Sequence, residues 1–194
     1  MEPGSHAVTW QPGLVLPPEK LTPDVIAAIK GTLFPAQVVG LTAWAEARSR
    51  FEKGKGWLPN PIDAMVDVIN VVHNRATDAR WQVLGHAGVC LQRWQFSCWE
   101  PTGGPDDPYD PDKLAENFEA LMARAQFLIA GKKPSEKLAS CIDVAESFLD
   151  GRHENVLPGA THYYATWITA PTWTRPPAEC VIERYGHRVF RNVV

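Results

Sequence analysis

Proline and capping residues divide most of this chain into short apolar segments with the spacing of helices. Proline has no amide hydrogen and a fixed φ, so it suits the first turn of a helix and disrupts the interior. Apolar residues recurring three and four positions apart mark one face of a helix. The clearest example follows Asn60-Pro61, where the apolar positions are Ile62, Met65, Val66, Ile69 and Val72. These signals predict a chain folded mainly from amphipathic helices.

Similar signals place the other elements. Helices are expected to start at Thr22-Pro23, Pro35, Asn60-Pro61, Asp110-Pro111 and Ser135, with Gly131 and Gly151 ending the last two. Residues 99–111 are predicted to form an acidic loop rich in Pro and Gly. After Val156, two short apolar pairs around Gly186 predict a hairpin. We therefore predict a mainly α (α+β) fold with a small β-hairpin near the C-terminus. The strand–helix alternation of nucleotide-binding folds is missing.

Length and charge limit the organisation and the partners. The 194 residues fit a single domain at 21–194, preceded by an extended Pro-rich segment at 1–20. A net charge of −3 gives no general attraction to nucleic acid. No apolar run approaches the ~20 residues of a membrane span, and the start of the chain is unlike a signal peptide. We expect a monomer that binds neither nucleic acid nor the membrane interior.

Metal and nucleophile signatures are missing from the sequence. The histidines lack H-x-x-x-H spacing, and the four cysteines lack C-x-x-C spacing, so neither a metal nor another cofactor is expected. G-x-S-x-G and papain-like patterns are also missing. The cysteines are expected to be free and buried, with a local disulfide between Cys90 and Cys98 as the alternative; the others are Cys141 and Cys180.

One carboxylate stands out among the candidate catalytic groups. Glu46 lies in the segment Ala43-Trp44-Ala45-Glu46-Ala47-Arg48, near the end of an apolar helix. Loss of hydration raises the pKa of a carboxyl group, and a general acid needs such a shift. The alternative is a surface glutamate paired with Arg48 or Arg50.

Two further segments have the composition of a polysaccharide groove. Residues 92–97 alternate polar and aromatic side chains without helical spacing, and residues 159–164 precede Trp167 and Trp173. Amide and hydroxyl groups bond sugar hydroxyls, while aromatic rings stack on sugar faces. Either segment would serve equally as a buried aromatic core.

Taken in order, these segments resemble a known family. The resemblance runs from about Leu41 to Phe190 and is to the spore cortex-lytic type of cell wall hydrolase. It rests on Ala45-Glu46-Ala47-Arg48, Val71-Val72-His73-Asn74-Arg75, Gln95-Phe96-Ser97, Gly159-Ala160-Thr161-His162-Tyr163-Tyr164, Trp173 and Gly186-His187-Arg188-Val189-Phe190.

The resemblance implies a lysozyme-like helical domain that cuts peptidoglycan between N-acetylmuramic acid and N-acetylglucosamine. Members of the family are commonly lytic transglycosylases, and their catalytic glutamate falls on Glu46. Peptidoglycan glycan strands are thus the expected partner. The expected substrate-binding residues are Gln95, Phe96, Ser97, His162, Tyr163, Tyr164, Trp173 and His187.

The sequence also departs from the family pattern. Ala45 replaces a glycine, Ser49-Arg50 replaces a Gly-Glu pair, and an insertion spans about Phe51 to Pro61. A one-carboxylate transglycosylase is therefore favoured over a muramidase, which would use water and a second acid. The candidates for that second acid are Glu52, Asp63 and Glu100.

Other functions remain as alternatives. A wall-binding or virion structural module without catalysis would also fit the altered first motif. An amidase or peptidase is disfavoured because its zinc or nucleophile signature is missing. Without a signal peptide, one route to the cell wall is release from the cytoplasm during phage lysis, as for an endolysin.

Overall fold

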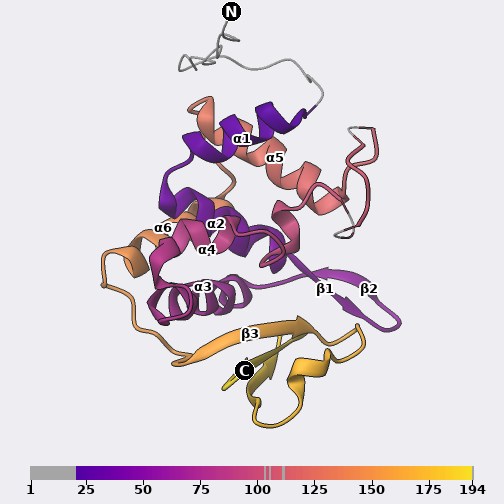
Figure 1. Cartoon of the computed structure of the whole chain (residues 1–194), viewed down its shortest axis with the longest axis vertical. Coiled ribbons are helices and arrows are strands. Elements are labelled where there is room, and N and C mark those ends of the chain that lie inside the picture. Colours follow the sequence, from indigo (N-terminus) through magenta and orange to yellow (C-terminus); the bar gives the residue numbers. More distant parts are fainter. Residues whose placement is uncertain (1–20, 103, 105, 111, 194) are drawn as a thin grey trace, which may run out of the picture.

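The computed structural model describes residues 21–102, 104, 106–110 and 112–193; the predicted extended segment 1–20 lies outside them. Helices form about half of this part, and two small antiparallel sheets lie beside them (Figure 1). The mainly α prediction with a small β element is confirmed. The helices are α1 (Pro23–Thr32), α2 (Pro35–Glu46), α3 (Ile62–Thr77), α4 (Gly85–Leu91), α5 (Glu116–Ile129) and α6 (Glu136–Leu149).

The predicted helix starts are confirmed with one exception. Thr22 Oγ1 accepts from the Val25 amide at 3.3 Å, and Ser135 Oγ caps α6 in the same way. The start predicted at Asp110 is wrong, because α5 begins at Glu116. The Asp110 carboxylate instead accepts from the Asp112 amide at 2.9 Å, which closes a turn before the helix.

Helix α2 is the centre of the core. Its side chains from Val38 to Ala43 are buried, and it packs against α3, α4, α5 and α6. Gly40 permits the approach of α6, because a Cβ at this position would lie 2.7 Å from Ile142 Cγ1. The helix that ends in Glu46 is therefore held on several sides.

The β structure is more extensive than predicted. Strands β3 (Ala160–Ala165), β5 (His187–Arg191) and β4 (Glu179–Arg184) pair in that order. The hairpin expected around Gly186 is confirmed as β4–β5, and Tyr185 and Gly186 both have positive φ, as a tight hairpin turn requires. Strands β1 (Ser49–Glu52) and β2 (Gly56–Pro59) form a second hairpin, which begins two residues before the insertion at about Phe51 to Pro61 and continues into it.

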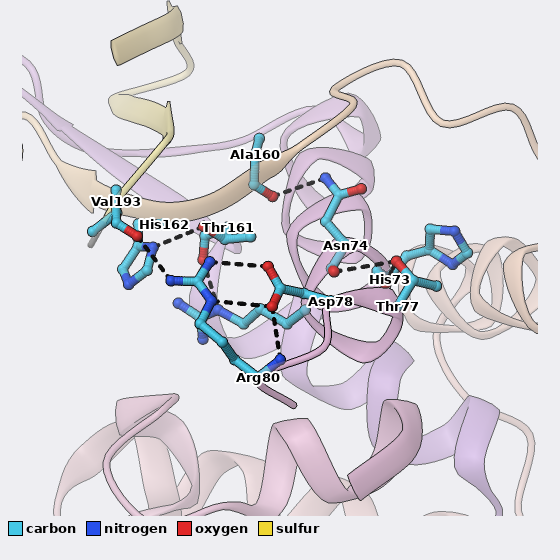
Figure 2. Close-up of polar contacts among 10 residues, drawn as sticks. His73, Asn74, Thr77, Asp78, Arg80, Ala160, Thr161, His162 and Val193 are labelled. Carbon is cyan, nitrogen blue, oxygen red and sulfur yellow. Dashed lines mark hydrogen bonds and ion pairs between the residues drawn. The ribbon is translucent and has the colours of Figure 1, made fainter. Parts of the chain in front are cut away.

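The three-stranded sheet lies beside α3 (Figure 1). Asn74 Nδ2 donates to the carbonyls of Leu157 and Ala160 at 2.7 and 2.8 Å. Beyond the helix, Arg80 pairs with Asp78 and also donates to the Val193 carbonyl, as Figure 2 shows. Side chains of α3 thus hold the start of β3, and the loop after α3 holds the residues that follow β5.

The cysteines are free in the structure. Cys90, Cys98 and Cys141 are buried, as expected, whereas Cys180 is exposed, so the prediction of burial is wrong for that residue. The alternative disulfide between Cys90 and Cys98 is not formed.

Among the described residues, no single helix has the length and apolar character to span a membrane. The consecutive helices α1 and α2 reach such a length only together, and they are bent by 116° at their junction.

Candidate active site

Glu46 is the last residue of α2, and its carboxylate receives hydrogen bonds from two distant segments. Oε1 accepts from the Cys98 amide at 2.9 Å and from Ser97 Oγ at 3.2 Å. Oε2 accepts from the hydroxyl of Tyr163 at 3.0 Å. Both carboxylate oxygens are therefore held in place by donors that are remote in the sequence.

The arginines near Glu46 bond to other partners. Arg48 Nη2 donates to Asn117 Oδ1 at 2.7 Å, and Arg50 Nη1 donates to Asn60 Oδ1 at 3.1 Å. Among the described residues, no ion pair joins Glu46 to either of them. The arrangement differs from that of an ordinary surface glutamate paired with a neighbouring arginine.

The Ser97 and Cys98 donors come from a single helical turn, Ser97–Trp99. The first amides of a helix have no partner within the helix, so they are available to a carboxylate. Trp99 fixes the turn to α2, because its buried indole Nε1 donates to Thr42 Oγ1 at 2.8 Å. Thr42 lies one turn before Glu46, which keeps the amides close to the carboxylate.

Tyr163 reaches Glu46 from β3. Burial raises the pKa of its hydroxyl well above the usual value of 10.0, and the negative charge of Glu46 reinforces the shift. The phenol therefore stays protonated and donates to the carboxylate at neutral pH. The ring of buried His187 lies edge-on to the Tyr163 ring, with centroids 5.4 Å apart. Burial lowers the pKa of His187, which favours its uncharged form.

Arg75 connects the two segments that supply these donors. Its Nε donates to the Thr161 carbonyl on β3 at 2.6 Å, and its Nη1 donates to Gln95 Oε1 at 3.1 Å. The guanidinium also lies over the Phe96 ring, 5.1 Å from its centroid. Arg75 belongs to one of the motifs that carry the family resemblance, but it was not predicted as a site residue. The sequence signal that could have identified it is its position three residues after Val72, which continues the apolar face of α3.

Burial lowers the pKa of Arg75 below its usual value, whereas the nearby Tyr163, Cys90 and Glu46 raise it. The guanidinium thus remains a buried cation in the field of Glu46. The two groups form the charged centre of the site, although no direct ion pair is formed between them.

A cleft of about 820 Å³ opens beside Glu46. One group of lining side chains is aromatic and contains Trp57 from β2 and Trp167, whose ring centroids are 5.5 Å apart. A second group is polar, and its members come from the end of α2 and the residues just after it, from the Ser97–Trp99 turn and the loop that follows, and from the start of α5. The lining residues are Ala45, Glu46, Arg48, Ser49, Trp57, Ser97, Thr102, Ala115, Glu116, Asn117 and Trp167.

The predicted substrate-binding residues fall into three groups. Ser97 lines the cleft with Glu46, and Tyr163 bonds to Glu46 directly. Gln95, Phe96 and His187 lie behind these groups and support them. Their contacts with substrate stay predictions.

His162, Tyr164 and Trp173 belong to a different cluster. Side chains alternate along a strand, so His162 and Tyr164 lie on the face of β3 opposite Tyr163. There Trp173 packs against His162, Tyr164 and Phe190. The structure does not bring these three predicted residues to the cleft beside Glu46. Tyr164 is buried, which favours the core interpretation for this side chain.

The candidates for a second carboxylate lie elsewhere. Glu52 pairs with Lys55 at 2.6 Å, Asp63 accepts from the Tyr185 hydroxyl at 3.3 Å, and buried Glu100 accepts from the Trp94 amide. The acidic residue that joins Glu46 among the described lining residues is Glu116. Its side chain is 96% exposed and lies 3.7 Å from Arg48.

Within the described residues, no group of three or more His, Cys, Asp or Glu side chains is placed to hold a metal ion. Two histidines do meet, since His73 Nδ1 and His86 Nε2 are 3.1 Å apart. Burial lowers the pKa of both rings.

Protonation of His162 should couple pH to stability. Burial, with the charges of Arg75 and Arg80, lowers its pKa from 6.5 to about 4. The unfolded chain therefore takes up a proton first as the pH falls. The folded state is stabilised by this difference in the pKa of His162. The stabilisation is complete above pH 6.5 and is lost as the pH falls towards 4. Between pH 7 and pH 4.5, the free energy of unfolding should fall by about 1–2 kcal/mol less in the His162→Gln variant than in the wild type. This figure includes an allowance for solvent around the half-buried ring.

Urea unfolding at pH 7 and pH 4.5 measures this difference. An equally large decline in the variant would show that His162 is not the responsible group.

A family model described as Cell Wall Hydrolase matches residues 60–191, which is more than half of the chain. The match includes α3, the Ser97–Trp99 turn and β3, and it begins after Glu46 and the β1–β2 hairpin. No curated protein and no solved structure matches the chain.

Proposed function

Since this chain belongs to the cell wall hydrolase family, we propose that it cuts the glycan strand of peptidoglycan, with Glu46 as general acid and base. The bond is the one between N-acetylmuramic acid and N-acetylglucosamine. The observation that carries the proposal is the Glu46 carboxylate, held by three donors at the side of a cleft that also contains two tryptophans.

Glycoside cleavage begins with proton transfer to the leaving-group oxygen. In the proposed mechanism, protonated Glu46 donates this proton as the bond to muramic acid breaks. The sugar then carries oxocarbenium character, which a fixed negative or polar group stabilises better than mobile water does. After the transfer, the Ser97, Cys98 and Tyr163 donors stabilise the carboxylate that forms.

Glu46 then acts as a base towards one of two nucleophiles. It accepts a proton from the C6 hydroxyl of muramic acid, which closes a 1,6-anhydro ring, or it activates water. Inversion by water requires a second carboxylate about 6.5–9.5 Å from the first. Because Glu52, Asp63 and Glu100 do not line the cleft, we favour the anhydro route, which needs only Glu46.

The same proposal includes a lysozyme-like arrangement and action by a monomer at the bacterial cell wall. It is supported by the placement of the acid at the end of a buried helix and by the cleft beside it. Release from the host cytoplasm during phage lysis is the proposed route to the wall.

Glu116 tests the choice between the two routes. If the reaction uses only Glu46, Glu116→Gln should change the turnover rate less than about threefold, because the exposed side chain lies beside Arg48. If Glu116 holds the water of an inverting hydrolase, the rate should fall by about 10² or more. The measurement is the initial rate of fragment release from purified peptidoglycan.

Mass spectrometry of the released fragments tests the proposal as a whole. We expect fragments that end in 1,6-anhydromuramic acid; hydrolysis would give reducing ends heavier by one water. Binding to the wall without release of fragments would instead identify a non-catalytic module.

A further inference from the structure

We infer that Trp57 and Trp167 form a sugar-stacking subsite that holds the glycan strand next to Glu46. The inference rests on the proposed function and adds a binding site to it. The family resemblance assigned substrate binding to neither indole, although Trp167 follows the groove-like segment 159–164. Trp57 lies before the residues that the family model matches.

Both indoles are exposed in the cleft that Glu46 lines. Trp57 is 62% exposed and Trp167 is 37% exposed, although large aromatic side chains usually gain stability by burial. Their rings meet edge to face at 5.5 Å. A pair of exposed indoles within one cleft is a surface suited to the C–H faces of sugar rings.

The pair is held by the fold. On one side, the Phe51 ring packs against Trp57 in an edge-to-face arrangement, with ring centroids 5.7 Å apart. On the other, Trp167 lies on the backbone of Gly186, where a Cβ would come within 2.7 Å of the indole. A side chain at Gly186 would therefore displace Trp167. The subsite is preorganised, which lowers the entropy cost of binding.

The hairpin that carries Trp57 is also fixed at its base. Arg50 donates to the carbonyl of Pro59 and to Asn60 Oδ1, both at 3.1 Å. Asn60 Nδ2 in turn donates to the carbonyl of Tyr185 at 3.2 Å, in the β4–β5 turn. Both tryptophans are thus attached to the same turn, so their mutual position does not depend on the hairpin alone.

The subsite is continuous with the reacting group. The ring centroids of Trp167 and His187 are 6.1 Å apart, and those of His187 and Tyr163 are 5.4 Å apart. The Tyr163 hydroxyl in turn donates a hydrogen bond to Glu46. The polar part of the lining, with Arg48, Thr102 and Asn117, supplies partners for hydroxyl and acetamido groups. An aromatic group and a polar group in one cleft match the two kinds of surface on an N-acetylated sugar.

Binding is best measured with proteins that cannot consume the substrate. All variants should carry Glu46→Gln, and affinity is measured by sedimentation with purified insoluble peptidoglycan. Trp57→Ala and Trp167→Ala should each weaken binding about tenfold, equivalent to about 1.4 kcal/mol. Trp57→Phe should retain most of the affinity, because it keeps an aromatic face.

Phe34→Ala is the matched control. Phe34 is 72% exposed and precedes the opposite end of α2 from Glu46, so its loss should leave binding unchanged. The Trp57 substitution is the more decisive one, because this exposed side chain contributes less to folding than Trp167. The inference would be overturned if the Trp57→Ala protein bound peptidoglycan as tightly as the Glu46→Gln protein that it is derived from. It would also be overturned if Phe34→Ala lost as much affinity as Trp57→Ala, or if the Glu46→Gln protein did not bind peptidoglycan.

The inference and the proposed function can fail separately. Tryptophan-dependent binding without fragment release by the wild-type protein would reject the enzyme and keep the subsite. If the wild-type protein releases fragments but Trp57→Ala does not weaken binding, the subsite is rejected and the enzyme is kept.

Discussion

Replacing Glu46 with Gln should reduce the rate of fragment release from peptidoglycan by about 10²- to 10⁴-fold. Glutamine keeps the shape of the side chain and can still accept hydrogen bonds from Ser97 and the Cys98 amide. It cannot donate the proton that the leaving sugar needs or accept one afterwards. The rate is measured from the soluble fragments released by the purified wild-type and variant proteins.

A matched substitution separates catalysis from a general effect of charge. Glu119→Gln removes the same charge from an exposed position on α5 that does not line the cleft, and it should leave the rate within about twofold of wild type. Unfolding curves should show that the Glu46→Gln protein remains folded. A Glu46→Gln protein with the wild-type rate would remove Glu46 from the mechanism.

The second large effect is expected at Arg75. Arg75→Met replaces the buried guanidinium with an apolar side chain and leaves the Thr161 carbonyl and Gln95 Oε1 without their donor. Loss of buried hydrogen bonds of this kind should lower the free energy of unfolding by about 2–4 kcal/mol. Activity should fall as well, because Arg75 links the segments that carry Ser97 and Tyr163.

Two controls define the contribution of Arg75. Arg75→Lys keeps the charge, but its single ammonium group does not reproduce the planar fork of donors, so it should restore only part of the stability. Arg93→Met removes an exposed arginine that lies over the Trp94 ring and should change stability by less than about 0.5 kcal/mol. Urea unfolding gives each value; an Arg75→Met protein as stable as wild type would contradict this account of the site.

The helices could be predicted from the sequence because their signals are local. Pro23, Pro35 and Ser135 mark helix starts through backbone geometry or a cap within one turn. The start at Asp110 failed for a related reason, since an aspartate caps a turn as readily as a helix. Glu46 was also a candidate from a local pattern, an acid at the end of an apolar helix, and the family resemblance supported the same residue.

The rest of the site depends on contacts between distant segments. A strand is defined by its partner, so the pairing of β1 with β2 was not visible in four-residue segments. The sequence grouped Tyr163 with His162 and Tyr164, but strand alternation places Tyr163 on a separate face. The role of Arg75 required knowledge of its acceptors, Thr161 and Gln95, which come from other segments.

The most direct test of the central claim counts two kinds of new chain ends in one digest of purified peptidoglycan. If Glu46 drives cleavage of the glycan, new muramic acid ends, anhydro or reducing, should appear in step with solubilisation, and free amino groups should stay at their starting level. Free amino groups that rise without new sugar ends would show that the protein cuts the stem peptide, and they would contradict the account.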